Sequence, residues 1–175
     1  MKKVSLPLTP EAIKDLKMGD EVLLTGKIYT GRDQAHLRFV QALDRGDKLP
    51  IDIKDQTIYY VGPTPERPGT PIGAAGPTTS SRMDPFAPRL IEVGLRGIIG
   101  KGPRNKAVID AIVKFGAVYF IAIGGAGAYL AKRINSLKVV AYEELGPESV
   151  KELTIVDFPV IVAIDSRGND IFKQS

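Results

Sequence analysis

From residue 84 onward, segments typical of strands alternate with segments typical of helices, and this order restricts the fold more than any other feature of the sequence. The pattern predicts strands at Leu95–Ile99, Ala117–Ile123, Leu137–Tyr142 and Val160–Asp165, a helix with Ala107, Val108, Ala111, Ile112 and Phe115 on one face, and a small-residue helix ending near Ile134. Such an order is typical of one α/β domain with a largely buried sheet. A chain of 175 residues can bury a core of this kind, so we expect a single domain over residues 1–175.

The first half continues the pattern with shorter elements. It predicts a helix from Thr9-Pro10 to about Leu16, a strand at Glu21–Tyr29, a helix from Asp33 to Gly46, a strand at Thr57–Val61 and a helix that opens at Asp84-Pro85. Asp33 is expected to be an N-cap, because a carboxylate there accepts hydrogen bonds from free backbone N–H groups.

Glycine and proline crowd the segment Gly62–Pro77 between the two halves. Such a segment forms neither a helix nor a central strand. In a compact domain, an irregular loop of this length is usually functional or disordered.

The chain has no cysteine and one histidine, His36. These counts exclude disulfides, cysteine nucleophiles, thiolate metal sites and an iron–sulfur cluster held by this chain's own thiolates. The longest apolar run, Ala117–Ala128, is too short to span a bilayer, and no apolar secretory segment follows the N-terminal Met1-Lys2-Lys3-Val4. We therefore expect a cytoplasmic protein without a metal site of its own or membrane contact.

The charge balance is mildly basic, with 24 Lys and Arg against 20 Asp and Glu and a net charge of +4. A basic chain suggests nucleic-acid binding. However, no stretch gathers five or more Lys and Arg residues, and tryptophan is absent. Scattered solvated lysines explain the charge better, and we expect no nucleic-acid partner.

Arg32 and His36 lie around the start of the predicted helix at 33–46. The planar guanidinium of Arg32 and the free N–H groups of a helix start both favour an anion. His36 follows four residues later, on the same side of the helix, and is a candidate acid/base group. Taken alone, Arg32 also fits a solvated loop arginine, and His36 also fits a surface histidine with a structural hydrogen bond.

The segment Gly76-Pro77-Thr78-Thr79-Ser80-Ser81-Arg82 is the strongest local signal. Four consecutive hydroxyl residues exceed what one helix cap needs, and Arg82 lies four residues after Thr78. The segment therefore predicts a small polar cup for an oxyanion, although it also fits a helix cap after a flexible loop.

Two glycine-rich segments follow predicted strands. In Gly100-Lys101-Gly102, the glycines leave room for a ligand beside the Lys101 ammonium, but the full phosphate-loop pattern is missing. The spacing in Gly124-Gly125-Ala126-Gly127-Ala128 does not match a dinucleotide fingerprint, and close helix packing explains it better. Arg32, Arg82 and Lys101, with Thr78 and His36, together predict a site for a small dicarboxylate.

The sequence also contains four motifs in a fixed order: Thr30-Gly31-Arg32-Asp33-Gln34-Ala35-His36, Gly76-Pro77-Thr78-Thr79-Ser80-Ser81-Arg82-Met83-Asp84, Gly100-Lys101-Gly102 and Asp157-Phe158-Pro159. With them, nearly the whole chain resembles the iron–sulfur-dependent class I fumarase and L-tartrate dehydratase family. Within that family it resembles the beta subunit, which is equivalent to the C-terminal domain of the single-chain enzymes.

The resemblance implies a swivelling β/β/α fold with a mixed sheet and flanking helices. It implies a hydro-lyase that hydrates fumarate to L-malate or, alternatively, removes water from tartrate to give oxaloacetate. In that family a [4Fe–4S] cluster held by three cysteines acts as a Lewis acid. Because this chain has no cysteine, the resemblance places the cluster on an alpha subunit, and this chain alone is expected to be inactive.

The resemblance also implies roles for single residues. Arg32, Arg82 and Lys101 match ligands of the substrate carboxylates, and Thr79 is expected to bind substrate beside them. Thr78 and His36 both match groups proposed for acid/base work, and the choice between them stays open. A non-catalytic dicarboxylate-binding module remains an alternative function, and the isolated chain is a candidate homodimer.

Overall fold

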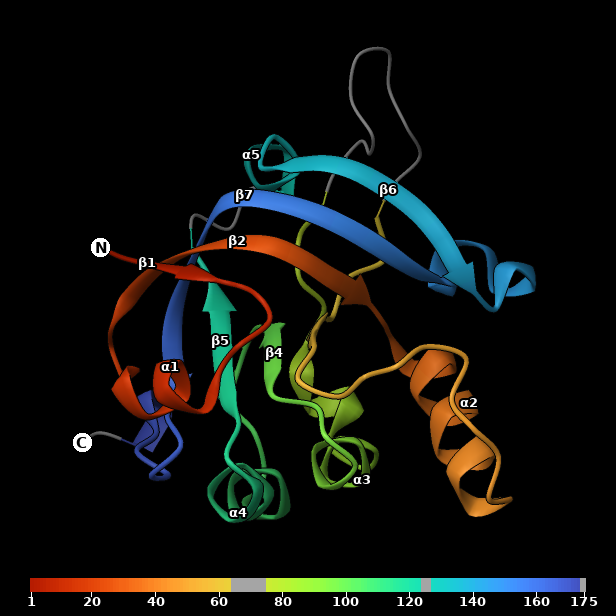
Figure 1. Ribbon diagram of the computed structural model, residues 1–175, viewed down its shortest axis with the longest axis horizontal. Coiled ribbons are helices and arrows are strands. Elements are labelled where there is room, and N and C mark those ends of the chain that lie inside the picture. The colour runs from red at the N-terminus through yellow and green to blue at the C-terminus, as the bar shows by residue number, and fades with distance from the viewer. Residues whose placement is uncertain (64–74, 124–126, 174–175) are drawn as a thin grey trace.

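The computed structural model describes residues 1–63, 75–123 and 127–173. Its elements are β1 (Lys2–Ser5), α1 (Pro10–Asp15), β2 (Glu21–Thr30), α2 (Asp33–Asp44), β3 (Thr57–Tyr59), the 3-10 helix η1 (Ser80–Met83), α3 (Ala87–Glu92), β4 (Gly97–Gly100), α4 (Lys106–Phe115), β5 (Val118–Ala122), α5 (Gly127–Ala131), β6 (Ile134–Ala141), η2 (Glu143–Glu148), β7 (Val150–Ile164) and η3 (Ile171–Lys173). In Figure 1, β2, β7 and β6 arch along one side of the molecule, and α2, α3 and α4 line the opposite side.

All the strands belong to one mixed sheet, in the order β1-β2-β3-β4-β5-β7-β6. An additional pairing of β2 with β7 closes the strands from β2 to β5, together with β7, into a barrel. The neighbours β2, β3, β4 and β5 run parallel, whereas β7 is antiparallel to both β2 and β5. The predicted α/β domain with a mixed sheet and flanking helices is therefore confirmed.

The barrel closes through the two long strands, β2 and β7. One edge of β2 pairs with both β1 and β3, and one edge of β7 pairs with both β5 and β6. Residues 22–25 of β2 pair with β1, and residues 29–30 pair with β3. The register of β2 against β7 shifts between Leu24 and Gly26. Gly26 has a φ of +140°, and a Cβ there would lie 2.9 Å from the Cβ of Leu6. Glycine thus permits the bulge through which β2 bends from one neighbour to the next.

Alternate residues of the strands pack into two different cores, as the period of two in a strand requires. From the β3 region, Ile58 and Tyr60 belong to the core that includes α2, α3 and α4. Tyr59 and Val61 belong to the other core, together with Phe120 and Phe158. A strand buried on both faces needs a nearly continuous apolar sequence, and this explains the apolar runs seen in β3, β4 and β5.

The structure corrects several predicted boundaries. The strand predicted at Val160–Asp165 begins at Val150, so that prediction is wrong at its start. Pro159 lacks an N–H group, but its carbonyl accepts from the N–H of Ile123 at 3.2 Å and the strand runs through it. The small-residue helix ends at Ala131, and Ile134 already belongs to β6. Strand β1 was not predicted.

Some predictions fall on residues that the structure does not describe. Of the predicted loop Gly62–Pro77, residues 64–74 lie outside the described part, and so do residues 124–126 of the glycine-rich segment after β5. Within the ranges 1–63, 75–123 and 127–173, no helix combines the length and the apolar character needed to cross a bilayer.

Candidate functional site

The carboxyl ends of parallel strands meet at one edge of a sheet, and three of the predicted segments follow such ends. Arg32 comes after β2, Gly62 after β3 and Lys101 after β4. The N–H of Gly31 donates to the carbonyl of Tyr59 at 3.0 Å, so the first two segments stay in contact beyond their strands. In α/β barrels and open α/β sheets alike, ligand sites lie at the carboxyl ends of the parallel strands.

The hydroxyl-rich segment lies across the same edge. The N–H of Thr78 donates to the carbonyl of Tyr60 at 2.7 Å. Thr79 forms a parallel bridge with Lys101. The N–H of Ser80 donates to the Lys101 carbonyl at 2.9 Å, and the N–H of Lys101 donates back to Ser80 Oγ at 3.0 Å. Thr78, Thr79 and Lys101 are thereby held next to one another by backbone hydrogen bonds.

Arg82 connects this segment to the start of α2. Its Nε and Nη2 both donate to Oδ2 of Asp33, at 3.0 and 2.5 Å. The prediction that Asp33 caps α2 is wrong: Arg32 occupies the N-cap position, and Asp33 is the first helical residue. The carboxylate turns toward the guanidinium of Arg82 because a charged donor pair is a stronger partner than backbone N–H groups.

Arg32 itself makes no side-chain capping hydrogen bond to α2. Its guanidinium lies against Gly62, where an added Cβ would come within 2.5 Å of Nη1. Its buried Nε has no hydrogen-bond partner among the described residues. The side chain of Arg32 therefore packs over Gly62 in the loop after β3.

His36 is fully buried, so the alternative of a surface histidine is wrong. Its Nδ1 lies 2.8 Å from the carbonyl oxygen of Arg32. Because a carbonyl only accepts, Nδ1 carries the proton and Nε2 is left as a buried acceptor without a partner among the described residues. Its ring packs edge-on against Tyr60, with centroids 5.2 Å apart.

Burial lowers the pKa of His36 to about 4, although the hydrogen bond to Arg32 acts in the opposite direction. The imidazole is therefore neutral at pH 7. Its one hydrogen bond fixes the backbone of Arg32 at the point where the chain turns into α2.

A buried polar layer supports the site from below. The side chain of Arg104 has 0% exposure and donates from Nε to Oδ1 of Asp84 at 2.7 Å. Its Nη2 donates to the hydroxyl of Tyr60 at 3.1 Å, and its guanidinium lies over the rings of Tyr60 and Tyr119. Burial raises the pKa of both tyrosines, so their hydroxyls stay protonated. No sequence pattern singled out Arg104, because an arginine after Gly102-Pro103 is indistinguishable from a solvated one.

The face above this layer is open. Lys101, Thr79 and Arg82 are exposed, and Thr78 and Arg32 are half-buried. The cationic and hydroxyl groups of this face are therefore accessible to solvent.

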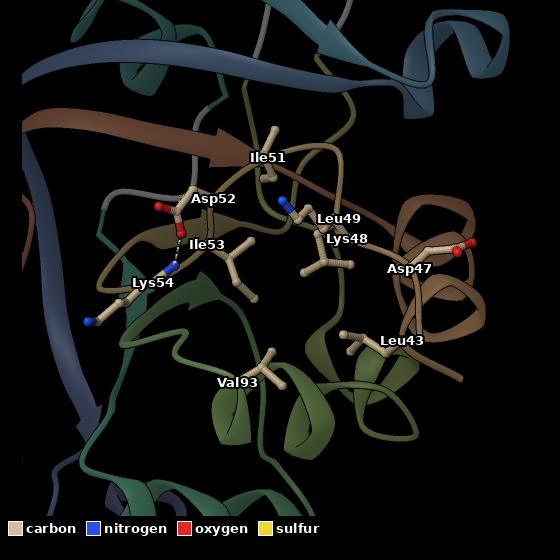
Figure 2. Close-up of a pocket in the computed structure, with 9 residues that line it drawn as sticks. All are labelled: Leu43, Asp47, Lys48, Leu49, Ile51, Asp52, Ile53, Lys54 and Val93. Carbon is tan, nitrogen blue, oxygen red and sulfur yellow. Dashed lines mark hydrogen bonds between the residues drawn. The ribbon is translucent and has the colours of Figure 1, made fainter. Parts of the chain in front are cut away.

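A pocket of about 350 Å³ lies elsewhere, at the opposite end of α2. Figure 2 shows that it is lined by apolar side chains such as Leu43 and Val93, with Asp52 accepting from the N–H of Lys54 at 3.1 Å. Arg32 and His36 belong to the N-terminal end of the same helix, whereas Leu43 belongs to its last turn. The pocket is thus separate from the candidate site.

The residues present do not fit an iron–sulfur cluster. The chain contains no cysteine thiolate. Across residues 1–63, 75–123 and 127–173, no three His, Asp or Glu side chains are grouped as metal ligands. The donors at the candidate edge are ammonium, guanidinium and hydroxyl groups, which repel or poorly bind a cationic metal centre.

This barrel carries cationic and hydroxyl groups at the carboxyl ends of its parallel strands and is thus an α/β domain with a cationic face. The chain belongs to the family described as Fumarase C-terminus, which matches residues 1–175. Over 153 residues it is 44% identical to "Fumarate hydratase class I, anaerobic" of Escherichia coli (strain K12), covering 86% of this chain and 28% of that protein. Over 170 residues it is 36% identical to "Fumarate hydratase 1, mitochondrial" of Leishmania major, covering 94% of this chain and 31% of that protein.

A shorter relative matches along most of its own length. The chain is 40% identical over 173 residues to "Putative L(+)-tartrate dehydratase subunit beta" of Methanocaldococcus jannaschii, covering 95% of this chain and 89% of that protein. The membership predicted from the sequence motifs is therefore confirmed.

Proposed function

We propose that this chain is the beta subunit of a hydro-lyase that hydrates fumarate to L-malate. The observation that carries the proposal is the assembly of Arg32, Thr78, Arg82 and Lys101 on one edge of the barrel. The backbone bonds of Thr78 and Ser80 to the strand ends and the pair of Arg82 with Asp33 hold them there. Relatives named for fumarate hydratase and for tartrate dehydratase support the reaction class.

The cations orient the substrate. Guanidinium groups form paired hydrogen bonds with carboxylates, and Lys101 adds a point charge. A dicarboxylate with both ends fixed presents its central carbons in one orientation, and much of the rate enhancement comes from such fixation. We assign the exposed hydroxyl of Thr79 to donate to one of these carboxylates.

Thr78 is the group assigned to proton transfer. In the dehydration direction, Thr78 Oγ1 takes the proton from carbon, and the electron pair of that C–H bond forms the double bond. The hydroxyl group leaves with the C–O electron pair as hydroxide and takes up one proton to become water, while the proton received by Thr78 is passed on to solvent. His36 is the weaker candidate, because it is fully buried and its Nδ1 is committed to Arg32. We therefore assign His36 to positioning.

The threonine hydroxyl is a weak base unless a neighbour accepts its own proton. Among the described residues, no carboxylate is paired with Thr78. We assign that acceptor, and the [4Fe–4S] cluster that the donor set of this chain does not fit, to a cysteine-bearing alpha subunit. The name of the archaeal relative, a subunit beta, supports a partner of this kind.

The test is anaerobic co-expression of this chain with an alpha subunit that carries three cysteines, followed by assays of fumarate loss and of oxaloacetate formation from tartrate. We expect fumarate turnover by the cluster-loaded complex and none by this chain alone. If the complex turns over tartrate but not fumarate, its substrate is tartrate, the alternative, and the assignment of fumarate is wrong. A cluster-loaded complex inactive on both, with a lone chain that still binds dicarboxylates in calorimetry, overturns the proposal in favour of a non-catalytic binding module.

A further inference from the structure

The ion pair between Arg104 and Asp84 is unusual because it is buried directly beneath an exposed site. The two side chains have exposures of 0% and 8%. Burying two charges carries a large desolvation penalty, and replacing such a pair with apolar groups is often neutral or stabilising. Stability alone is thus a weak explanation for the pair, and Nη1 of Arg104 even lacks a partner among the described residues.

The carboxylate of Asp84 joins the two loops that carry the site. Asp84 directly follows η1, the element that contains Arg82. Its Oδ1 accepts from Arg104 Nε at 2.7 Å, and its Oδ2 accepts from the N–H of Asn105 at 2.9 Å. Both partners lie on the loop that leads from Lys101 to α4. The two acceptor bonds therefore fix the distance between the end of the hydroxyl segment and the lysine loop.

A second link connects the same loops through Tyr119. Its hydroxyl lies 2.7 Å from both Ser80 Oγ and the carbonyl of Gly102. Since the carbonyl only accepts, Tyr119 donates to Gly102 and accepts from Ser80. The guanidinium of Arg104 in turn lies over the ring of Tyr119, with its Cζ 4.9 Å from the centroid of that ring.

Arg104 also reaches the remaining loop through Tyr60. The Tyr60 hydroxyl accepts from Arg104 Nη2 at 3.1 Å, and the Tyr60 carbonyl accepts from the N–H of Thr78. The ring of Tyr60 makes a T-shaped contact with the ring of His36, which holds the backbone of Arg32. One guanidinium is therefore in contact with the supports of every segment at the site.

We propose that Arg104 and Asp84 are positioning residues for the dicarboxylate reaction: they set the spacing of Lys101 from Arg82 and Thr78 without touching the substrate. The proposal rests on the function proposed above. A displacement of about 1 Å between anchoring groups costs up to about 100-fold in rate, so the pair acts through geometry rather than through its own charge.

The test is the double variant Arg104→Met with Asp84→Asn in the complex with the alpha subunit. Methionine fills the space of the arginine stem, and the amide oxygen of asparagine still accepts from the N–H of Asn105. The matched control is Arg89→Met with Asp44→Asn, which removes the exposed ion pair between α3 and α2. Thermal unfolding and steady-state kinetics with fumarate are measured for both.

We expect kcat/KM of the buried double variant to fall about 10- to 100-fold with a raised KM, while its unfolding midpoint stays close to that of the control. A merely structural role lowers the fraction of active enzyme, and hence the apparent kcat, but leaves KM unchanged; that result overturns the proposal. So do kinetics equal to those of the parent complex.

Two further measurements distinguish a failure of the positioning role from a failure of the proposed function. Should the double variant not fold, Tyr119→Phe removes only a hydroxyl from the second link, and we expect a smaller rise in KM; an unchanged KM contradicts the proposal. The parent complex serves as the reference throughout. Its inactivity on both fumarate and tartrate refutes the proposed function, whereas an active parent and an equally active variant refute only the positioning role.

Discussion

Arg82 and Asp33 form an ion pair that joins the hydroxyl segment to the first turn of α2, with Nε and Nη2 of the arginine both donating to Oδ2 of the aspartate. Nη1 of Arg82 takes no part in this pair. Side-chain exposures of 49% and 29% place the pair at the surface, so it contributes little to stability, on the order of 1 kcal/mol or less. The effect of the pair is instead to fix the orientation of the Arg82 guanidinium.

The variant Asp33→Asn tests this orientation. It retains the shape of the side chain but weakens the charge-assisted bonds to Arg82. We expect the KM for fumarate in the complex to rise several-fold, with an unfolding midpoint within a few degrees of the parent. The control is Asp44→Asn, which weakens an exposed ion pair, with side-chain exposures of 43% for Arg89 and 61% for Asp44, at the other end of the same helix. A lower KM in Asp33→Asn would mean that Asp33 competes with the substrate, contrary to our account.

Gly62→Ala tests the placement of Arg32. The new Cβ would lie 2.5 Å from Nη1 and 3.0 Å from Cδ of Arg32, so this flexible side chain must move while the backbone stays. We therefore expect a higher KM without loss of thermal stability. In an Arg32→Met background the same glycine substitution should have no further effect, since coupled residues are not additive. Equal KM increments in both backgrounds would show that Gly62 acts by another route.

The burial of His36 predicts a pH dependence of stability. Its folded pKa of about 4 lies below the unfolded value of 6.5, so the unfolded chain binds the proton first as the pH falls. The free energy of unfolding is therefore unaffected by this group above pH 6.5 and declines as the pH falls toward 4. His36 alone accounts for a decline of up to about 3 kcal/mol.

Chemical denaturation of the parent chain and of His36→Gln between pH 7.5 and pH 4.5 measures this effect. We expect the free energy of unfolding of the parent to fall more steeply with decreasing pH than that of the variant. Parallel curves for the two proteins would contradict a buried, neutral imidazole.

Local patterns predicted the local elements well. Helices α2 and α4 were predicted from apolar residues at helical spacing, because each buries one face on the sheet. The barrel was not predicted, since its closure depends on the antiparallel pairing of β2 with β7, such as Val22 with Val160. No short-range signal encodes a pairing over that separation.

At the site, too, local motifs were predicted and long-range contacts were not. The motifs located Arg32, Thr78, Arg82 and Lys101, and the strand ends bring their segments together. Capping rules failed at Asp33 because its partner, Arg82, comes from a distant loop. The burial of His36 was likewise not readable, since its aromatic neighbours Tyr60 and Phe86 lie far along the chain.

The most direct test of the central claim compares two lysine substitutions in the active complex. Lys101 lies at the proposed site, whereas Lys106 is an exposed lysine at the start of α4, with its side chain 85% exposed. Lys101→Met and Lys106→Met remove the same formal charge, so the net charge of the chain changes equally. We predict that kcat/KM for fumarate falls about 10- to 100-fold in Lys101→Met, the loss expected for a charge-assisted contact, and stays at the parent value in Lys106→Met. Equal activities of the two variants would contradict a dicarboxylate site at this edge of the barrel.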